Sequence, residues 1–192
     1  MLFRSVRNAQ GVPVFDRETM QCGNAPIFIA GDVNSDVPLL HEAADEGRIA
    51  GENAARFPDV RADMRRAPLS IVFTDPQIAV VGGGLRAARD CAFVTGVVSF
   101  DDQGRARVMQ RNRGRLHVYA EIGTGLLLGA EMIGPDAEHL GHLLAWALQL
   151  DLTVGQMLKL PFYHPVVEEA LRTALRDAYA KLGAAALAKR AA

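Results

Sequence analysis

The sequence has few cysteines, almost no net charge and no long apolar run, and each of these absences excludes a class of protein. Cys22 and Cys91 are its two cysteines. They form neither a CxxC pair nor a disulfide framework, so we expect isolated, buried thiols. The formal net charge of -1 offers no bulk attraction to nucleic acid or to an anionic membrane. No stretch approaches the ~20 apolar residues that span a bilayer, and Met1 is not followed by a signal-like segment. We therefore expect a cytoplasmic protein that binds neither nucleic acid nor membrane.

The composition is that of an ordinary globular protein, with 49% hydrophobic and 22% charged residues in a chain of 192. Such a chain can bury one sizeable core or two small ones. Between Phe57 and Pro68 the residues are charged and show no apolar period, so we predict a linker over 58–68. It divides the chain into a first block, 1–57, and a second block, 69–192.

In the first block the pattern predicts a hairpin-like start, a buried strand over 27–30 and then a helix. The strand ends at Gly31-Asp32, and the helix begins near Leu39-Leu40-His41 and ends before Phe57. A carboxylate at the carboxyl end of a strand can meet a ligand where α/β folds bind cofactors, and a helix N-terminus favours electron-rich groups. Taken alone, Gly31-Asp32 is equally compatible with a plain turn.

The second block predicts several strands with hairpin spacing followed by two helices, which indicates an antiparallel α+β domain. The strand-like runs cover 69–73, 92–100, 105–109, 116–121 and 126–133. The helical patterns cover 137–150 and 166–182. The Ala-rich tail over 183–192 has little to bury, and we expect it to fray.

Several partial motifs are better explained without a ligand. The run 32–36 begins like a calcium loop and His41-Glu42 like a zinc-protease helix, but both lack the residues that complete the site. Gly82-Gly83-Gly84 lacks the spacing of a phosphate-binding loop and predicts a flexible turn. The arginines between 105 and 115 favour a solvated hairpin face over RNA binding. We predict no metal site.

The stretch from His164-Pro165 to Glu169 is the most informative part of the second block. A prolyl bond can hold a sharp turn in cis, and the helix after it can place Glu169 back towards His164. A carboxylate on one imidazole nitrogen fixes the tautomer and raises the basicity of the other, as an acid–base dyad requires. A histidine beside a proline is more often a plain helix-start residue, so this interpretation depends on its context.

Together these stretches resemble the pyridine nucleotide–disulfide oxidoreductase family, and within it the dihydrolipoamide dehydrogenases. The resembling segments, in the family's order, are 27–32, the helix start at Leu39-Leu40-His41, 68–79, and His164-Pro165 with Glu169. They span nearly the whole chain. The resemblance implies that Asp32, after Gly31, holds the ribityl chain of FAD. It also implies that the N–H groups at Leu39, Leu40 and His41 face the flavin and that 68–79 opens a dimerisation domain.

The resemblance further implies oxidation of dihydrolipoamide, free or on a lipoyl domain, with FAD and NAD as cofactors. A substrate thiolate attacks an enzyme disulfide, His164 takes the thiol proton, and Glu169 orients His164. In the family this dyad serves the active site of the partner subunit, so the implied protein is a homodimer. The predicted helix that carries Trp146 is a candidate for part of the interface.

Three family features are missing from the sequence: a GxGxxG FAD-binding strand, a CxxxxC redox disulfide and a central NAD(P)-binding domain. We therefore expect the C-terminal part of a longer oxidoreductase, inactive alone, with 1–57 completing an FAD-binding domain and 69–192 forming the dimerisation domain. The alternatives are a stand-alone dimerisation module and a glutathione-reductase-like or transhydrogenase-like relative. Mercuric reductase is disfavoured because its C-terminus resembles neither His164-Pro165 with Glu169 nor the cysteine-free ending here. Val166-Val167 stands where many members have threonine, which leaves a divergent subfamily open.

Overall fold

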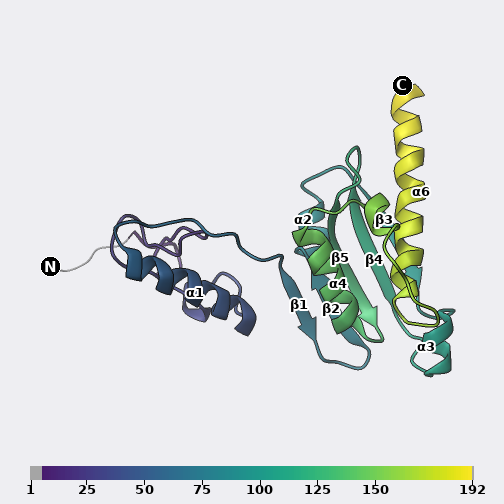
Figure 1. Ribbon diagram of the computed structural model, residues 1–192, viewed down its shortest axis with the longest axis horizontal. Helices are drawn as coiled ribbons and strands as arrows, with labels where there is room; N and C mark the ends of the chain where they lie inside the picture. Colours follow the sequence, from purple (N-terminus) through teal and green to yellow (C-terminus); the bar gives the residue numbers. More distant parts are fainter. Residues whose placement is uncertain (1–5, 192) are drawn as a thin grey trace. The chain divides into compact units, whose positions relative to one another are not determined.

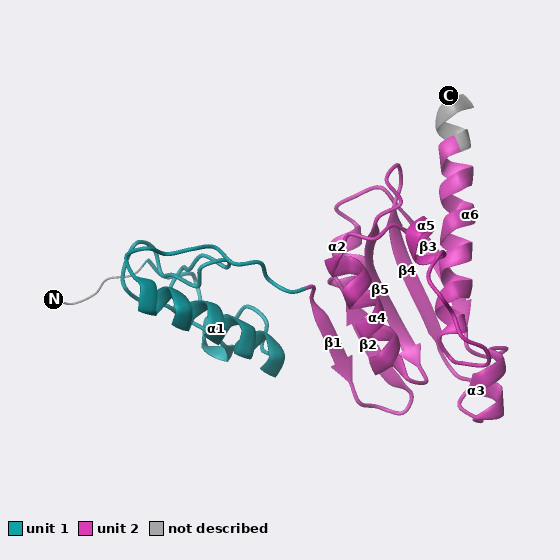
Figure 2. Cartoon of the chain, in the orientation of Figure 1, with its two compact units in different colours: residues 1–66 teal, residues 67–192 magenta. Residues whose placement is uncertain are grey.

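The computed structural model describes residues 6–191, and the boundary between its two compact units lies between Arg66 and Ala67 (Figure 2). The boundary falls near the end of the predicted linker. No helix within the described range has the length and apolar character needed to cross a lipid bilayer.

An antiparallel sheet of five strands, in the order β1-β2-β5-β4-β3, forms the second unit (Figure 1). Its strands are β1 (Leu69–Val72), β2 (Gln77–Val81), β3 (Phe93–Ser99), β4 (Arg115–Glu121) and β5 (Leu127–Gly134). The register pairs Met132 of β5 with Ala79 of β2 and with Leu116 of β4. Because side chains alternate along a strand, these three buried residues share one face of the sheet. The predicted α+β fold is confirmed.

Two long helices cover that face. Helix α4 (Ala137–Gln149) packs on β1, β2 and β5, and α6 (Glu169–Ala191) packs on β3 and β4. The shorter helices are α2 (Gly84–Ala88), α3 (Gly104–Val108) and α5 (Val154–Met157). The buried residues of α6 are spaced as the sequence predicts, at Val167 just before the helix and at Leu171, Ala174, Leu175 and Ala178 within it. This apolar stripe fixes the start of α6 against the sheet.

Two predicted strands are wrong. The run 27–30 forms only a single bridge, Phe28 to Gln21, because the described part of the first unit contains no strand that pairs with it. The run 105–109 is helical, because the side chain of Gln103 accepts a hydrogen bond from the N–H of Ala106 and so caps α3. Arg105 and Arg107 therefore lie on a short helix, Arg111 and Arg113 on the loop after it, and Arg115 begins β4.

Three smaller expectations also differ from the structure. Strand β2 is absent from the sequence-based prediction, although its run is largely apolar. Cys22 is buried as expected, but Cys91 is exposed because it lies in the turn between α2 and β3. Helix α6 continues through the tail to Ala191 where fraying is expected, in keeping with the high helix propensity of alanine.

The first unit is built around helix α1 (Leu40–Arg56), which follows a short 3-10 turn, Asp32–Asn34. Its interior combines a small apolar set with buried polar side chains. Among residues 6–66, the buried ones are Met20, Cys22 and Ile49, together with Asn34, Glu42, Asp45, Glu46 and Asn53. Hydrogen bonds therefore stabilise much of the interior of the first unit, whereas apolar contacts stabilise the core of the second unit.

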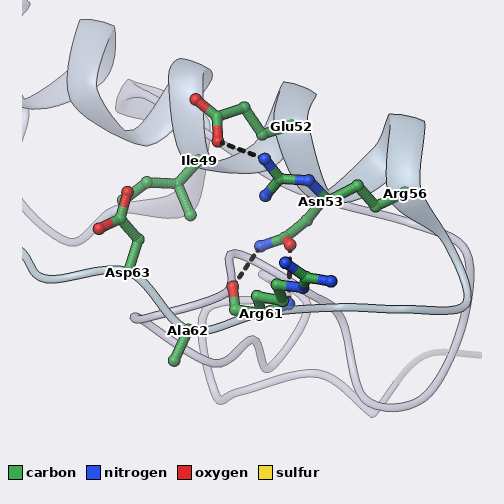
Figure 3. Close-up of a pocket in the computed structure, with 7 residues that line it drawn as sticks. All are labelled: Ile49, Glu52, Asn53, Arg56, Arg61, Ala62 and Asp63. Carbon is green, nitrogen blue, oxygen red and sulfur yellow. Dashed lines mark hydrogen bonds and ion pairs between the residues drawn. The ribbon is translucent and has the colours of Figure 1, made fainter.

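Most of the predicted linker is fixed on α1. The side-chain amide of Asn53 donates to the carbonyl oxygens of Thr19 and Arg61, and its oxygen accepts from the N–H of Arg61. Figure 3 shows Asn53 facing Arg61 in a small pocket between α1 and residues 61–63. Arg65 donates to Glu42 at 2.7 Å and to Glu46 at 3.0 Å. The charged segment up to residue 66 is thus an integral part of the first unit.

The close approach of α6 to the sheet requires the glycine at position 96. A Cβ built on Gly96 of β3 would overlap the carbonyl oxygen of Ala174 and lie 2.7 Å from the Cβ of Ala178. Gly96→Ala should therefore lower the free energy of unfolding by about 1–3 kcal/mol, the usual cost of overpacking a core. Urea unfolding followed by circular dichroism measures this loss. Gly104→Ala is the matched control, because a Cβ there meets nothing within 4 Å. Equal midpoints for the two variants would contradict the close packing.

Candidate functional site

The structure brings His164 and Glu169 into direct contact. The His164-Pro165 peptide bond is cis, and Glu169 is the first residue of α6. Nδ1 of His164 lies 3.1 Å from Oε1 and 3.0 Å from Oε2 of Glu169. Since a carboxylate accepts, Nδ1 of the neutral ring carries the proton, and the lone pair of Nε2 is free to take another.

The turn that carries the pair is anchored on both sides. Gln103, which caps α3, donates from Nε2 to the carbonyl oxygen of Val166 at 2.8 Å. The N–H of Val166 donates to Oε2 of Glu169 at 3.3 Å, and Val167 is buried in the core. The backbone between the two members of the pair is therefore fixed by the domain itself.

Exposure differs sharply within the pair. The side chain of His164 is 80% exposed, whereas that of Glu169 is 17% exposed. The pKa of Glu169 is lowered, chiefly by the hydrogen bond with His164. Partial burial opposes this shift. The N–H of Val166 and the positive charges of His164 and Arg172 lower the pKa further. Its place at a helix N-terminus favours the same charged form. The arrangement pairs an ionised, oriented carboxylate with an imidazole that faces solvent.

Arg172, one turn further along α6, is a third member of this cluster that sequence reasoning missed. Its Nη2 donates to Oε1 of Glu169 at 3.0 Å. The i, i+3 spacing of a glutamate and an arginine at a helix start is the signal that could have found it.

The predicted flavin-binding residues belong to the first unit. Gly31 has a φ of +77° and lies so close to α1 that an added Cβ would stand 3.4 Å from the Cβ of Ala43. Asp32 is exposed. Leu39 is the N-cap of α1 and provides no side-chain cap, so the first-turn N–H groups after it are available to an acceptor.

Glu46 holds this loop and was also missed by sequence reasoning. It is fully buried, and its Oε2 accepts hydrogen bonds of 2.7 Å from the N–H of Gly31 and from the amide of Asn34. Leu40 and His41, also predicted at the site, are exposed at the start of α1. Within residues 6–191, no three His, Cys, Asp or Glu side chains are grouped as metal ligands.

The sequence of the second unit matches a known family model. Residues 69–175 match the model described as "Pyridine nucleotide-disulphide oxidoreductase, dimerisation domain". The chain belongs to the pyridine nucleotide–disulfide oxidoreductase family. The matched residues include His164 and Glu169, so this pair lies within the region that matches the dimerisation domain.

Similar members of this oxidoreductase family carry several names. The chain is 36% identical to a dihydrolipoyl dehydrogenase of Haloferax volcanii over 79% of this chain and 32% of the relative. It is 31% identical to a mercuric reductase of Acidithiobacillus ferrooxidans over 87% of this chain and 30% of the relative. The crystal structure of LpdA from Mycobacterium tuberculosis aligns with a TM-score of 0.76 and 25% identity, over 90% of this chain and 38% of that one. The chain thus spans about a third of the length of these curated relatives.

The ion pair should be visible in the titration of Glu169. We expect the Glu169 carboxyl carbon, followed by NMR in the full chain, to report a pKa below the usual value of about 4.3. His164→Gln should move that pKa upwards, because it removes the largest cause of the shift.

The same shift links stability to pH. Since the folded pKa lies below the unfolded one, the wild type should gain stability over Glu169→Gln above about pH 4.3 and lose the gain as the pH falls through the folded pKa. Unfolding midpoints across this range measure the effect. A gain that grows on acidification would contradict the pairing.

Proposed function

We propose that the chain supplies the acid–base dyad and the dimer contacts of a dihydrolipoamide dehydrogenase, with His164 as the base and Glu169 as its orienting carboxylate. The observation that carries the proposal is the contact of Nδ1 of His164 with Glu169 inside a family-matched dimerisation domain. The dihydrolipoyl dehydrogenase name of similar relatives supports this substrate.

The chemistry asked of His164 is removal of a thiol proton. A free thiol ionises near pH 8.5, so at neutral pH a base is needed to generate the nucleophilic thiolate. Nε2 would accept the proton from a substrate S–H, leaving a thiolate and an imidazolium. The ionised carboxylate of Glu169 stabilises that imidazolium and keeps the Nε2 lone pair directed outwards. The same nitrogen would return the proton in the reverse direction.

The residues of the first unit fit a flavin cofactor. An exposed carboxylate at Asp32 suits the hydroxyl groups of a ribityl chain, and the uncapped first turn of α1 suits an electron-rich ring edge. FAD would supply the two-electron acceptor, and NAD the final hydride acceptor. Glu46 would hold Gly31, and hence Asp32, in place from beneath.

A homodimer follows from the same proposal. Helix α4 presents exposed apolar side chains at Leu143, Trp146 and, at its C-cap, Leu150. Their i, i+3, i+7 spacing places them on one face. Exposed apolar stripes of this kind mark protein–protein contacts. We infer that this face contributes to the contact between two copies of the chain.

The runner-up function is a dimerisation module with no catalysis of its own. It is favoured by the two cysteines, because Cys22 is buried in one unit and Cys91 is exposed in the other. The two cysteines therefore do not form the pair of neighbouring thiols that disulfide chemistry needs. A glutathione-reductase-like or transhydrogenase-like relative is a further alternative at the level of substrate.

The role of His164 can be tested by substitution in the complete reductase that carries this chain. His164→Gln should slow dihydrolipoamide oxidation, followed as NADH formation, by roughly two decades or more, the usual contribution of a general base. His117→Gln is the matched control, because His117 lies on β4, on the face of the sheet that α4 and α6 do not cover. A near-normal rate in the His164 variant would remove it from the mechanism.

The role of α4 can be tested on the chain itself. Trp146→Glu should weaken the dimer at least tenfold, since a buried interface tryptophan often contributes 2 kcal/mol or more, roughly a thirtyfold effect. Sedimentation equilibrium measures the dissociation constant. Val108→Glu, at an exposed apolar residue on α3, should leave it unchanged. Equal constants for the two variants would place the interface elsewhere.

A further inference from the structure

In the described part of the chain, the carboxylate of Glu169 accepts from three residues, of which His164 is one. Oε1 accepts from Nη2 of Arg172 at 3.0 Å. Oε2 accepts from the N–H of Val166 at 3.3 Å. His164 then approaches both oxygens through Nδ1. With Arg172 on one oxygen and Val166 on the other, rotation of the carboxylate is blocked independently of the histidine.

Arg172 is itself held in place. Its guanidinium carbon lies 5.7 Å from the centroid of the Phe162 ring, a cation–π contact. Its side chain is 34% exposed, and its neighbour Leu171 is buried against the sheet. The arginine is therefore confined by α6 on one side and by the loop before His164 on the other.

Within residues 6–191, the exposed imidazole has no comparable restraint, since its polar contacts are with Glu169. Because His164 is mostly solvent-exposed, the direction of its ring depends on the carboxylate that Nδ1 meets. If that carboxylate turned, the ring could rotate or take the other tautomer, and Nε2 would no longer present a free lone pair.

We propose that Arg172 is a positioning residue for the dyad: it fixes the Glu169 carboxylate, and through it the tautomer and direction of His164. This inference rests on the proposed function for its catalytic consequence, but its structural part stands on the contacts within this chain. Arg172 touches neither substrate nor cofactor in this scheme, so its loss should lower kcat and leave KM nearly unchanged.

The test compares Arg172→Leu with Arg172→Lys and with Arg176→Leu. Lysine retains a donor and the charge, and Arg176 is an exposed arginine one turn further along the same helix. The first measurement is the long-range 1H–15N NMR spectrum of the His164 ring in the full chain above pH 8, assigned by the signals that His164→Gln removes. Wild type, Arg172→Lys and Arg176→Leu should show the Nδ1–H tautomer, and Arg172→Leu should shift towards the Nε2–H form.

The second measurement is turnover in the complete reductase. Arg172→Leu should lose roughly tenfold in kcat, less than the ~hundredfold that a misplaced catalytic group can cost, and Arg172→Lys should recover most of it. An unchanged tautomer in Arg172→Leu overturns the positioning role. An unchanged rate in His164→Gln instead overturns the proposed function, and the tautomer result is read separately because it needs no reaction. Urea unfolding of each variant shows whether the fold is intact. If Arg172→Lys shows the same tautomer shift as Arg172→Leu, this result also contradicts the proposal.

Discussion

The packing of α6 on the sheet is the constraint on which the candidate site depends. Ala174 and Ala178 approach β3 so closely that position 96 has room only for glycine. The apolar stripe in the first part of the helix, from Ala170 to Ala178, is buried. Because a helix is rigid over a few turns, the contact between α6 and β3 determines where the first residue of α6 lies. Glu169 is that residue, so a contact between small side chains determines the place of a charged one.

The two units hold their candidate site residues in place in different ways. In the second unit an apolar core positions the start of a helix, and the polar groups lie at its edge. In the first unit a buried carboxylate, Glu46, accepts from Gly31, Asn34 and Arg65. An apolar side chain could not replace it without leaving those donors unpaired. Apolar packing positions Glu169 in the second unit, and hydrogen bonds position Gly31 in the first.

This contrast explains which parts of the fold and of the candidate site could be predicted from the sequence. Amphipathic periodicity predicts α4 and α6 because the buried stripe repeats every turn. Glu169 is predicted from a different signal, its place at the start of the helix that follows His164-Pro165. It fails at 105–109, where an apolar alternation suits a strand but the cap from Gln103 makes a helix. It fails again at 27–30, since a strand depends on neighbours that no local pattern encodes. Glu46 is missed because its partners, among them Gly31 and Arg65, lie far from it in the sequence. Arg172 has a local partner, but a glutamate and an arginine at i, i+3 are common on ordinary charged helix surfaces.

The exposure of His164 links the two parts of the proposed function. A base in open water gains little from its carboxylate, because solvent screens the pair and competes for the proton. Thiol chemistry at Nε2 therefore requires another surface to cover the imidazole and exclude water. A second copy of the chain could bring such a surface, and an exposed apolar stripe on α4 gives a means of recruiting it. Under the proposed function, catalysis by His164 and dimerisation would then depend on each other, since the base would become effective only where a partner's surface covers it.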